Sequence, residues 1–120
     1  METIEPMAPH IVPSQELRIG SGRTRMFIGA EHAAGVSYFF VDNEPGQGPD
    51  LHRHPYSETW VVLEGEVTVT ADGVDHRAGV GDILVVGPET PHRFRAEGEG
   101  TLKMMCIHAS PRIEQEFLDA

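Results

Sequence analysis

Short runs of β-branched, aliphatic and aromatic residues alternate along the chain with turns rich in glycine, proline and aspartate. We expect strands at residues 24–28, 36–41, 59–63, 67–71, 74–78, 83–86, 92–96 and 102–109. Many short strands at this spacing are typical of a β-sandwich or a β-barrel. The pattern therefore predicts an all-β protein.

Two of the turns have the composition of hairpin turns. Asp72-Gly73 separates two strand-like runs, and this dipeptide favours a two-residue turn in which both residues have positive φ. Glu64-Gly65 stands between the runs WVVL and EVTVT in the same way. We expect a hairpin at each of these places.

Alternation along a strand sets which side chains share a face. If Glu58 points into the barrel, Trp60 and Val62 do so too. If His92 points inward, Phe94 follows it. These side chains are expected to form the apolar lining of a pocket around a polar centre.

The strand at 36–41 is apolar on both faces, so its orientation stays open. Either Tyr38 with Phe40 or Phe39 with Val41 completes the pocket lining, and we take Tyr38 and Phe40 as the predicted pair. A strand that is apolar on both faces is usually covered on both sides. We therefore expect a second copy of the chain to cover the outer face, which makes the protein a homodimer.

The two ends of the chain differ from the middle. Residues 1–22 hold several prolines and are expected to form an extended arm of the same domain, while residues 23–120 form the barrel. After the last strand, Ser110 is a candidate N-cap, Pro111 suits a first helical position, and the apolar residues beyond recur at helical spacing. A short C-terminal helix is expected there.

Composition narrows the classes of partner. A chain of 120 residues is one domain, and its 9 basic against 19 acidic residues give a formal charge of −10. This charge repels phosphate backbones and anionic lipids, so no nucleic-acid or membrane partner is expected. The single cysteine, Cys106, and the lack of a signal-peptide pattern or a long apolar run favour the cytoplasm.

Four residues of the types that bind metal ions form a candidate set between residues 52 and 92. His52 and His54 are two residues apart, so on a strand both point to one face, with Cα atoms about 6.6–6.8 Å apart. Glu58 can return to the same point from the next strand, and His92 completes a set of four. Three imidazoles and a carboxylate suit one divalent transition metal per chain, whether Fe, Mn, Ni, Co or Zn.

These residues resemble the first motif of the cupin superfamily. That motif has a glycine, five residues, His-x-His, three or four residues, a glutamate, six residues and a glycine. Gly46, His52, His54, Glu58 and Gly65 satisfy every spacing. The resemblance, to the small single-domain (cupin 2) type, implies a double-stranded β-helix, or jelly-roll barrel, with a metal site inside.

The second cupin motif is matched less fully. Gly81 and His92 fit it, but Gly87 stands in place of a proline, Glu89 in place of a glycine and Ala96 in place of an asparagine. The ligand set is nevertheless intact. The whole resemblance extends from about residue 36 to residue 108.

For function, the resemblance implies a metal-dependent enzyme, and the leading expectation is a dioxygenase-like oxidoreductase acting on a small enolic or aromatic substrate. The alternatives are a metal-assisted isomerase, cyclase or lyase, and a non-catalytic binding module. Glu58 is the candidate catalytic base, because a carboxylate ligand can take up a proton. His108, on the face shared by Met104 and Cys106, either lines the pocket mouth or packs against the closing helix, and packing is favoured.

Overall fold

The structure is a computed structural model and describes residues 8–118. It consists of strands with two short 3-10 helices, in the order η1 (Ser14–Leu17), β1 (Arg25–Phe27), η2 (Gly29–His32), β2 (Ser37–Asn43), β3 (His52–Arg53), β4 (Glu58–Glu64), β5 (Glu66–Ala71), β6 (Val74–Gly79), β7 (Ile83–Val86), β8 (His92–Glu97), β9 (Leu102–His108) and β10 (Glu116–Phe117). Every predicted strand is present, so the all-β prediction is confirmed.

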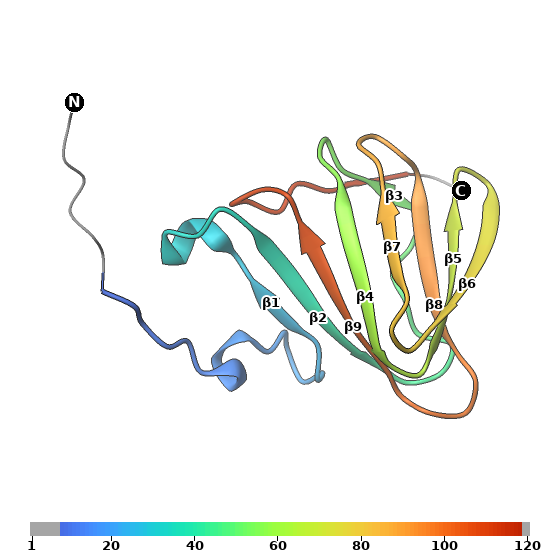
Figure 1. Ribbon diagram of the computed structural model, residues 1–120, viewed down its shortest axis with the longest axis horizontal. Helices are drawn as coiled ribbons and strands as arrows, with labels where there is room; N and C mark the ends of the chain where they lie inside the picture. Colours follow the sequence, from blue (N-terminus) through green and yellow to red (C-terminus); the bar gives the residue numbers. More distant parts are fainter. Residues whose placement is uncertain (1–7, 119–120) are drawn as a thin grey trace.

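The strands form two five-stranded sheets, ordered β1-β2-β9-β4-β7 and β10-β3-β8-β5-β6 (Figure 1). All pairings are antiparallel. Apart from β1-β2 and β5-β6, the neighbours in each sheet are not consecutive in the chain, as in a jelly roll. The inward side chains of both sheets form one apolar core: Val41, Trp60, Val62, Val67, Val69, Val86, Phe94, Ala96, Leu102, Met104 and Cys106.

The two glycine turns behave differently. Asp72 and Gly73, with φ of 50° and 78°, join β5 to β6 as the expected hairpin. Gly65 does not make a hairpin, because β4 pairs with β7 and β9 whereas β5 pairs with β6 and β8. It takes φ of 82° where a Cβ atom would lie 2.5 Å from the Thr101 carbonyl oxygen, so only glycine fits this crossover between the sheets.

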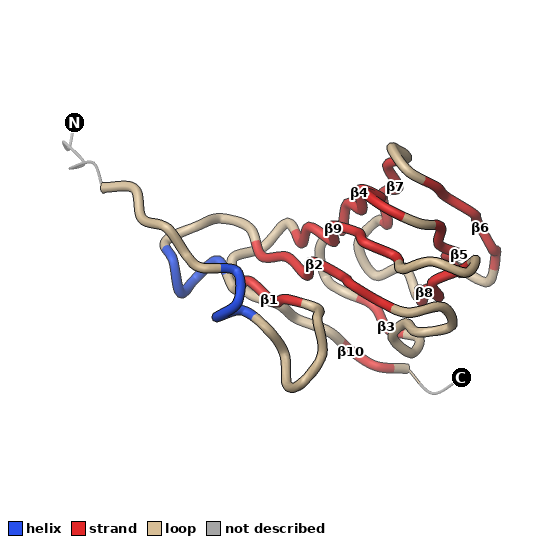
Figure 2. Tube along the Cα trace, turned by 90° about the horizontal axis from the view of Figure 1, so that it is seen from below, coloured by secondary structure: helices blue, strands red, loops and turns tan. Residues whose placement is uncertain are grey.

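The prediction of a C-terminal helix is wrong. Among residues 110–118 the structure has turns and extended backbone, and Glu116–Phe117 pairs with β3 as strand β10 (Figure 2). The Leu118 N–H donates to the Leu51 carbonyl at 2.9 Å. A helix this short is marginal by itself, whereas the sheet edge gives the backbone hydrogen-bond partners.

The predicted arm lies partly outside the described residues, which exclude 1–7. Residues 8–13 form no regular element, and η1 follows Pro13, whose carbonyl accepts from the Glu16 N–H at 3.0 Å. A bridge between Arg18 and Arg25 then ties the arm to the start of β1. Within the described residues no helix is long and apolar enough to cross a membrane.

Candidate metal centre

The four predicted ligand residues meet inside the barrel. His52 lies on β3 and is paired with His92, the first residue of β8, while Glu58 begins β4. His54 follows β3 directly. All four are buried, and one ligand atom from each lies within 4.8 Å of the others. The sequence spacing thus predicted a cluster that the fold does assemble.

Backbone carbonyls fix how the three imidazoles present themselves. The Nδ1 atoms of His52, His54 and His92 lie 2.8 Å from the carbonyl oxygens of Asp50, Glu114 and Thr90, respectively. A carbonyl oxygen can only accept, so each Nδ1 carries a proton. In the neutral ring Nε2 then keeps its lone pair, which is the arrangement that metal-binding histidines use.

Glu58 lies at the centre of the cluster. Its Oε1 is 3.1 Å from His54 Nε2 and 3.2 Å from His92 Nε2, while Oε2 is 3.2 Å from His108 Nε2. Burial raises the pKa of Glu58, but its close contacts with the rings of His108, His54 and His92 outweigh burial and hold the pKa well below its ordinary value. The carboxylate is therefore ionised at neutral pH.

The two neighbouring histidines have opposite pKa shifts. Burial is the main cause that lowers the pKa of His52 to about 4, so this ring stays neutral in mild acid. Burial also lowers the pKa of His54, but the contact with the Glu58 carboxylate and the hydrogen bond to the Glu114 backbone raise it above its ordinary value. His54 is the ring on which protons compete most strongly with a metal.

The cluster has the chemistry that a divalent transition metal requires. His54 Nε2 is buried and has no hydrogen-bond partner among the described residues, although its Nδ1 is well bonded. An unsatisfied buried nitrogen is costly unless it serves another purpose. Three nitrogen donors and an ionised carboxylate converging on one point fit such an ion.

The loop before His92 explains one departure from the second cupin motif. Glu89 stands where that motif has glycine, and its φ of 63° shows that the backbone still adopts the left-handed conformation. The Glu89 N–H donates to the His54 carbonyl at 2.7 Å, which ties this loop to the first ligand segment. The glutamate therefore has a strained backbone conformation that glycine would adopt freely.

A cavity of about 860 Å³ opens beside the cluster, between the two sheets. His52 and Glu58 form part of its wall. Apolar side chains beside them continue the wall: Phe39, Val41, Phe94, Cys106 and, from β10, Phe117. A small molecule in this cavity would therefore have one end at the cluster and an apolar surface along its length.

The residues predicted to line the pocket lie in three different places. Phe94 lines the cavity, whereas Trp60 and Val62 point inward as expected but are packed in the core, with the Trp60 ring 5.2 Å from that of Phe94. Tyr38 and Phe40 lie on the outer face of β2, in a separate depression with Met105. The cause is the register of β2 on β9, which turns the alternate residues Phe39 and Val41 inward.

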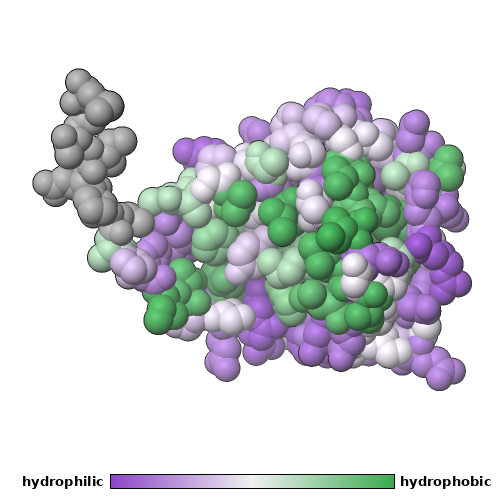
Figure 3. All heavy atoms as spheres, viewed as in Figure 1, coloured by the Kyte–Doolittle hydropathy of each residue, from purple (hydrophilic) through white to green (hydrophobic). Residues whose placement is uncertain are grey.

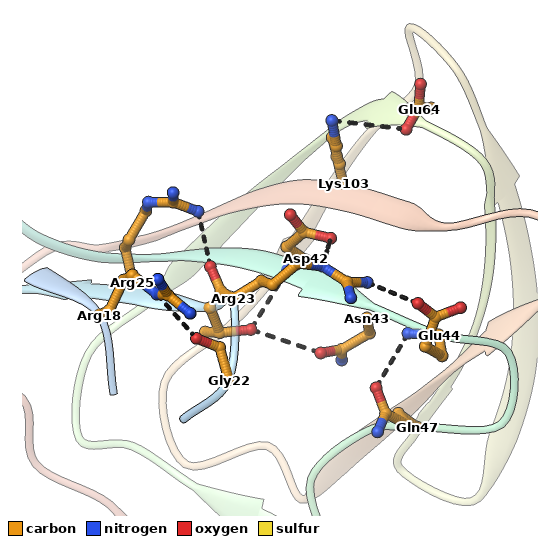
Figure 4. A network of polar contacts seen from close by, with 11 residues as sticks. Arg18, Gly22, Arg23, Arg25, Asp42, Asn43, Glu44, Gln47, Glu64 and Lys103 are labelled. Atoms are coloured by element: carbon orange, nitrogen blue, oxygen red, sulfur yellow. Dashed lines mark hydrogen bonds and ion pairs between the residues drawn. The ribbon is translucent and has the colours of Figure 1, made fainter. Parts of the chain in front are cut away.

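A polar network closes the end of the cavity formed by the loop before β1 and the end of β2 (Figure 4). Arg23 contacts Asp42 at 3.0 Å and Glu44 at 2.7 Å. The Glu44 N–H donates to the Gln47 side chain at 2.9 Å, and Thr24 contacts Asn43 at 3.4 Å. This rim is polar and charged, in contrast to the apolar wall near the cluster.

His108 is the site residue that sequence reasoning placed incorrectly. It is 1% exposed, and its Nε2 faces Glu58 while its Nδ1 lies 2.6 Å from the Tyr56 hydroxyl. The predicted packing against a closing helix fails because no such helix forms. Strand parity with Met104 and Cys106 was the available signal, since both face the interior. Burial raises the pKa of the Cys106 thiol well above its ordinary value, which makes it unreactive.

A family model for the cupin domain matches residues 39–108, more than half of the chain and the part that holds all four clustered residues. The chain belongs to the cupin family. The expected family, and the double-stranded β-helix that it implies, are both confirmed.

Several curated proteins resemble this cupin. The polyketide synthase CurC of Streptomyces cyaneus is 30% identical over 90% of this chain and 73% of its own length. The dimethylsulfoniopropionate lyase DddW of Ruegeria pomeroyi is 30% identical over 79% and 69%, respectively. An uncharacterized protein of Methanocaldococcus jannaschii is 34% identical over 55% of this chain. The match covers about half (54%) of that protein's length.

Solved structures agree on the fold of this cupin. A cupin 2 domain-containing protein from Halorhodospira halophila superposes with a TM-score of 0.72 at 24% identity, covering 82% of this chain and 70% of that one. An oxalate oxidase superposes with a TM-score of 0.70 at 23% identity, covering 79% and 54%. At this identity the two structures support the architecture alone.

Proposed function

We propose that this cupin is a metal-dependent enzyme that holds one divalent transition metal per chain through His52, His54, Glu58 and His92. The observation that carries the proposal is that four buried donors converge beside an open cavity. The three Nδ1–H bonds to carbonyls and the ionised Glu58 prepare these donors before any metal arrives. When bound, the ion supplies Lewis acidity and, for a redox metal, electron transfer to O₂.

The cavity favours a flat substrate larger than a two-carbon acid. Pockets of about 300–1,000 Å³ are typical for molecules of drug size, and this cavity of about 860 Å³ lies in that range. The rings of Phe39, Phe94 and Phe117 offer apolar surface for an enolic or aromatic molecule. The likeness to the polyketide synthase CurC supports this substrate class, because polyketides contain enolic and aromatic groups.

For the reaction, we propose dioxygenase-like oxidation. The wall next to His52 and Glu58 includes the apolar side chains of Phe39, Phe94 and Phe117, which leave room for O₂, and Asp50 and Gln115 also line the cavity. Glu58 is the proposed proton acceptor, and its low pKa makes it a weak base. It can therefore deprotonate only an acidic group, such as an enol or phenol held against the cluster.

The second candidate is a metal-assisted lyase, cyclase or isomerase. The relative DddW, named as a lyase, favours this reading because it matches most of the chain. Such an enzyme would polarise a substrate carbonyl and would consume no O₂. A module that binds metal without catalysis is the remaining outcome.

One experiment separates these outcomes. Protein loaded with Fe(II) is given a panel of enolic and aromatic substrates, and O₂ uptake is followed with an electrode. The same panel is then run without oxygen on protein loaded with Zn(II). His76 is an exposed histidine on β6 and serves as the control position. O₂ uptake that disappears in Glu58→Gln and persists in His76→Gln supports the dioxygenase-like reaction. Anaerobic turnover with zinc contradicts it, and tight metal binding without turnover favours the binding module.

We also propose that the protein is a homodimer. The outer face of the β1-β2-β9-β4-β7 sheet is apolar over β4 and β7, where Figure 3 shows a continuous hydrophobic surface. Leu63, Ile83 and Val85 are 49%, 66% and 65% exposed there. Large exposed apolar patches usually mark an interface. Light scattering should give twice the chain mass for the wild type and the single mass for Val85→Glu.

A further inference from the structure

A line of polar contacts runs from the C-terminal segment to the cluster. The Glu114 N–H donates to the Tyr56 hydroxyl oxygen at 3.0 Å. The same oxygen lies 2.6 Å from His108 Nδ1, and His108 Nε2 lies 3.2 Å from Glu58 Oε2. Tyr56 and His108 therefore connect the backbone at Glu114 with one oxygen of the central carboxylate.

The direction of these contacts can be read from the donors and acceptors. The Tyr56 oxygen already accepts the Glu114 N–H, so its own proton needs an acceptor. Two are within reach, His108 Nδ1 at 2.6 Å and the Glu114 carbonyl oxygen at 3.4 Å. The shorter contact is the stronger one. His108 Nδ1 is then the acceptor, and in the neutral ring the proton lies on Nε2.

This tautomer directs the Nε2–H of His108 at Glu58. Nε2 lies 3.2 Å from Oε2 of Glu58, in a region where both side chains are almost fully buried. With its proton on Nε2, the His108 ring attracts that oxygen. The N–H is not aligned for a linear hydrogen bond, so the contact acts as a charge–dipole attraction.

His108 therefore differs from the three clustered histidines. Their Nδ1 atoms donate to carbonyls and their Nε2 atoms are free to bind a metal. His108 has the reverse arrangement and does not belong to the group whose ligand atoms lie within 4.8 Å of one another. It touches Oε2 of Glu58, while His54 and His92 touch Oε1.

We propose that His108, fixed by Tyr56, is a positioning residue that holds Oε2 of Glu58 and so leaves Oε1 as the one oxygen offered to the metal. The proposal rests on the proposed metal site, but its first test does not depend on catalysis. A carboxylate that binds through one oxygen occupies one coordination position instead of two. With Oε2 held by His108, a bound ion would keep that second position for substrate.

The first test is the tautomer of each buried histidine. Protein with ¹⁵N-labelled histidine is studied by NMR, metal-free and zinc-loaded, at a pH about two units above the ordinary histidine value of about 6.5. His108 should carry its proton on Nε2 in both samples, and His52, His54 and His92 should carry theirs on Nδ1. In Tyr56→Phe, His108 should lose its single tautomer. A proton on Nδ1 of wild-type His108, on both of its nitrogens, or a zinc-dependent shift typical of a bound Nε2, overturns the proposal.

The second test is metal affinity, measured by competition with a chelator. Removing the hydrogen-bond partner of a ligand typically weakens binding 10- to 100-fold. We expect that loss in His108→Leu, a smaller loss in Tyr56→Phe, and recovery to within about tenfold of wild type in His108→Gln, whose amide N–H can reach Oε2. Equal affinity in all four proteins overturns the proposal. If His108→Leu does not fold, the metal affinity of Tyr56→Phe and the tautomer of His108 in the wild type still test the proposal.

The two failures are distinguishable. If the tautomers and affinities come out as expected but no substrate turns over, the positioning role stands and the proposed enzyme fails. If turnover is found while His108 has the ligand-type tautomer, the enzyme stands and the positioning role fails.

Discussion

The two halves of the barrel interior are built by the same strands, but the inward side chains are polar in one half and apolar in the other. On β4, β8 and β9 the inward position at one end is polar, occupied by Glu58, His92 and His108. Two and four residues further along each strand, the inward positions are apolar. One half holds a cluster prepared for a metal, and the other half is a packed core.

The residues that stabilise the fold and the residues suited to chemistry are thus separated along each strand. The apolar half buries side chains such as Val67 and Leu102 completely, which is the main source of folding free energy. The polar half uses its hydrogen bonds to hold imidazoles in one orientation. A substitution in the apolar half should therefore leave metal binding largely intact, and a substitution in the polar half should leave the folding stability largely intact.

The largest expected effect on stability is in the apolar half. Leu102 is fully buried, so Leu102→Ala should lower the free energy of unfolding by about 2–5 kcal/mol through lost burial and a cavity. Denaturant titration measures the loss. The folded protein should still bind one metal per chain, and loss of metal at full folding would break the separation between the halves.

Removal of the metal should have the next largest effect. The apolar core does not include the cluster, so the chelated protein should stay folded. The ion adds stability by linkage, about 3–4 kcal/mol when present at 100–1,000 times its Kd. Circular dichroism and thermal melting with and without chelator measure this. A disordered chelated chain would show that the polar half is needed for folding.

Acid should weaken metal binding before it unfolds the core. Only neutral imidazoles bind metal, and the raised pKa of His54 favours its protonated form. Affinity should thus begin to fall as the pH drops through this raised value, that is, from above the ordinary value of about 6.5. His52, with a pKa of about 4, should take up a proton last. Chelator competition at a series of pH values checks this, and unchanged affinity at a pH of about 5 would point to another site.

The smallest effect concerns the loop that carries His92. Glu89 has a left-handed backbone that costs about 1–2 kcal/mol for a residue with a Cβ atom. Glu89→Gly should raise the free energy of unfolding by up to about 1 kcal/mol. Glu89→Ala is the matched control, and it should give no gain because alanine keeps the Cβ atom. Denaturant titration compares the two variants, and equal stability would mean that the polar half stores no such strain.

Local patterns predicted most of the fold and the ligand set. Alternation placed Glu58 with Trp60 and Val62 on the inner face, and the spacing of His52, His54 and His92 identified the cluster. These features depend on residues close together along the chain or on a motif with fixed spacing. They require no knowledge of which strands are neighbours.

The features that sequence missed depend on contacts between distant segments. Gly65 resembles a hairpin residue, but its partner is the backbone at Thr101. The pattern of residues 110–118 suits a helix, but Glu116 and Phe117 instead pair with β3 as β10. The role of His108 follows from its contacts with Tyr56 and Glu58, which only the completed fold brings together.

The most direct test of the metal centre is elemental analysis of protein purified without added metal. We predict about one divalent transition metal per chain in the wild type and in His76→Ala, whose histidine is exposed on β6. We predict a large loss in His54→Ala and in His92→Ala, because each removes one of four donors from a folded chain. Full metal content in both of the latter variants would contradict the account.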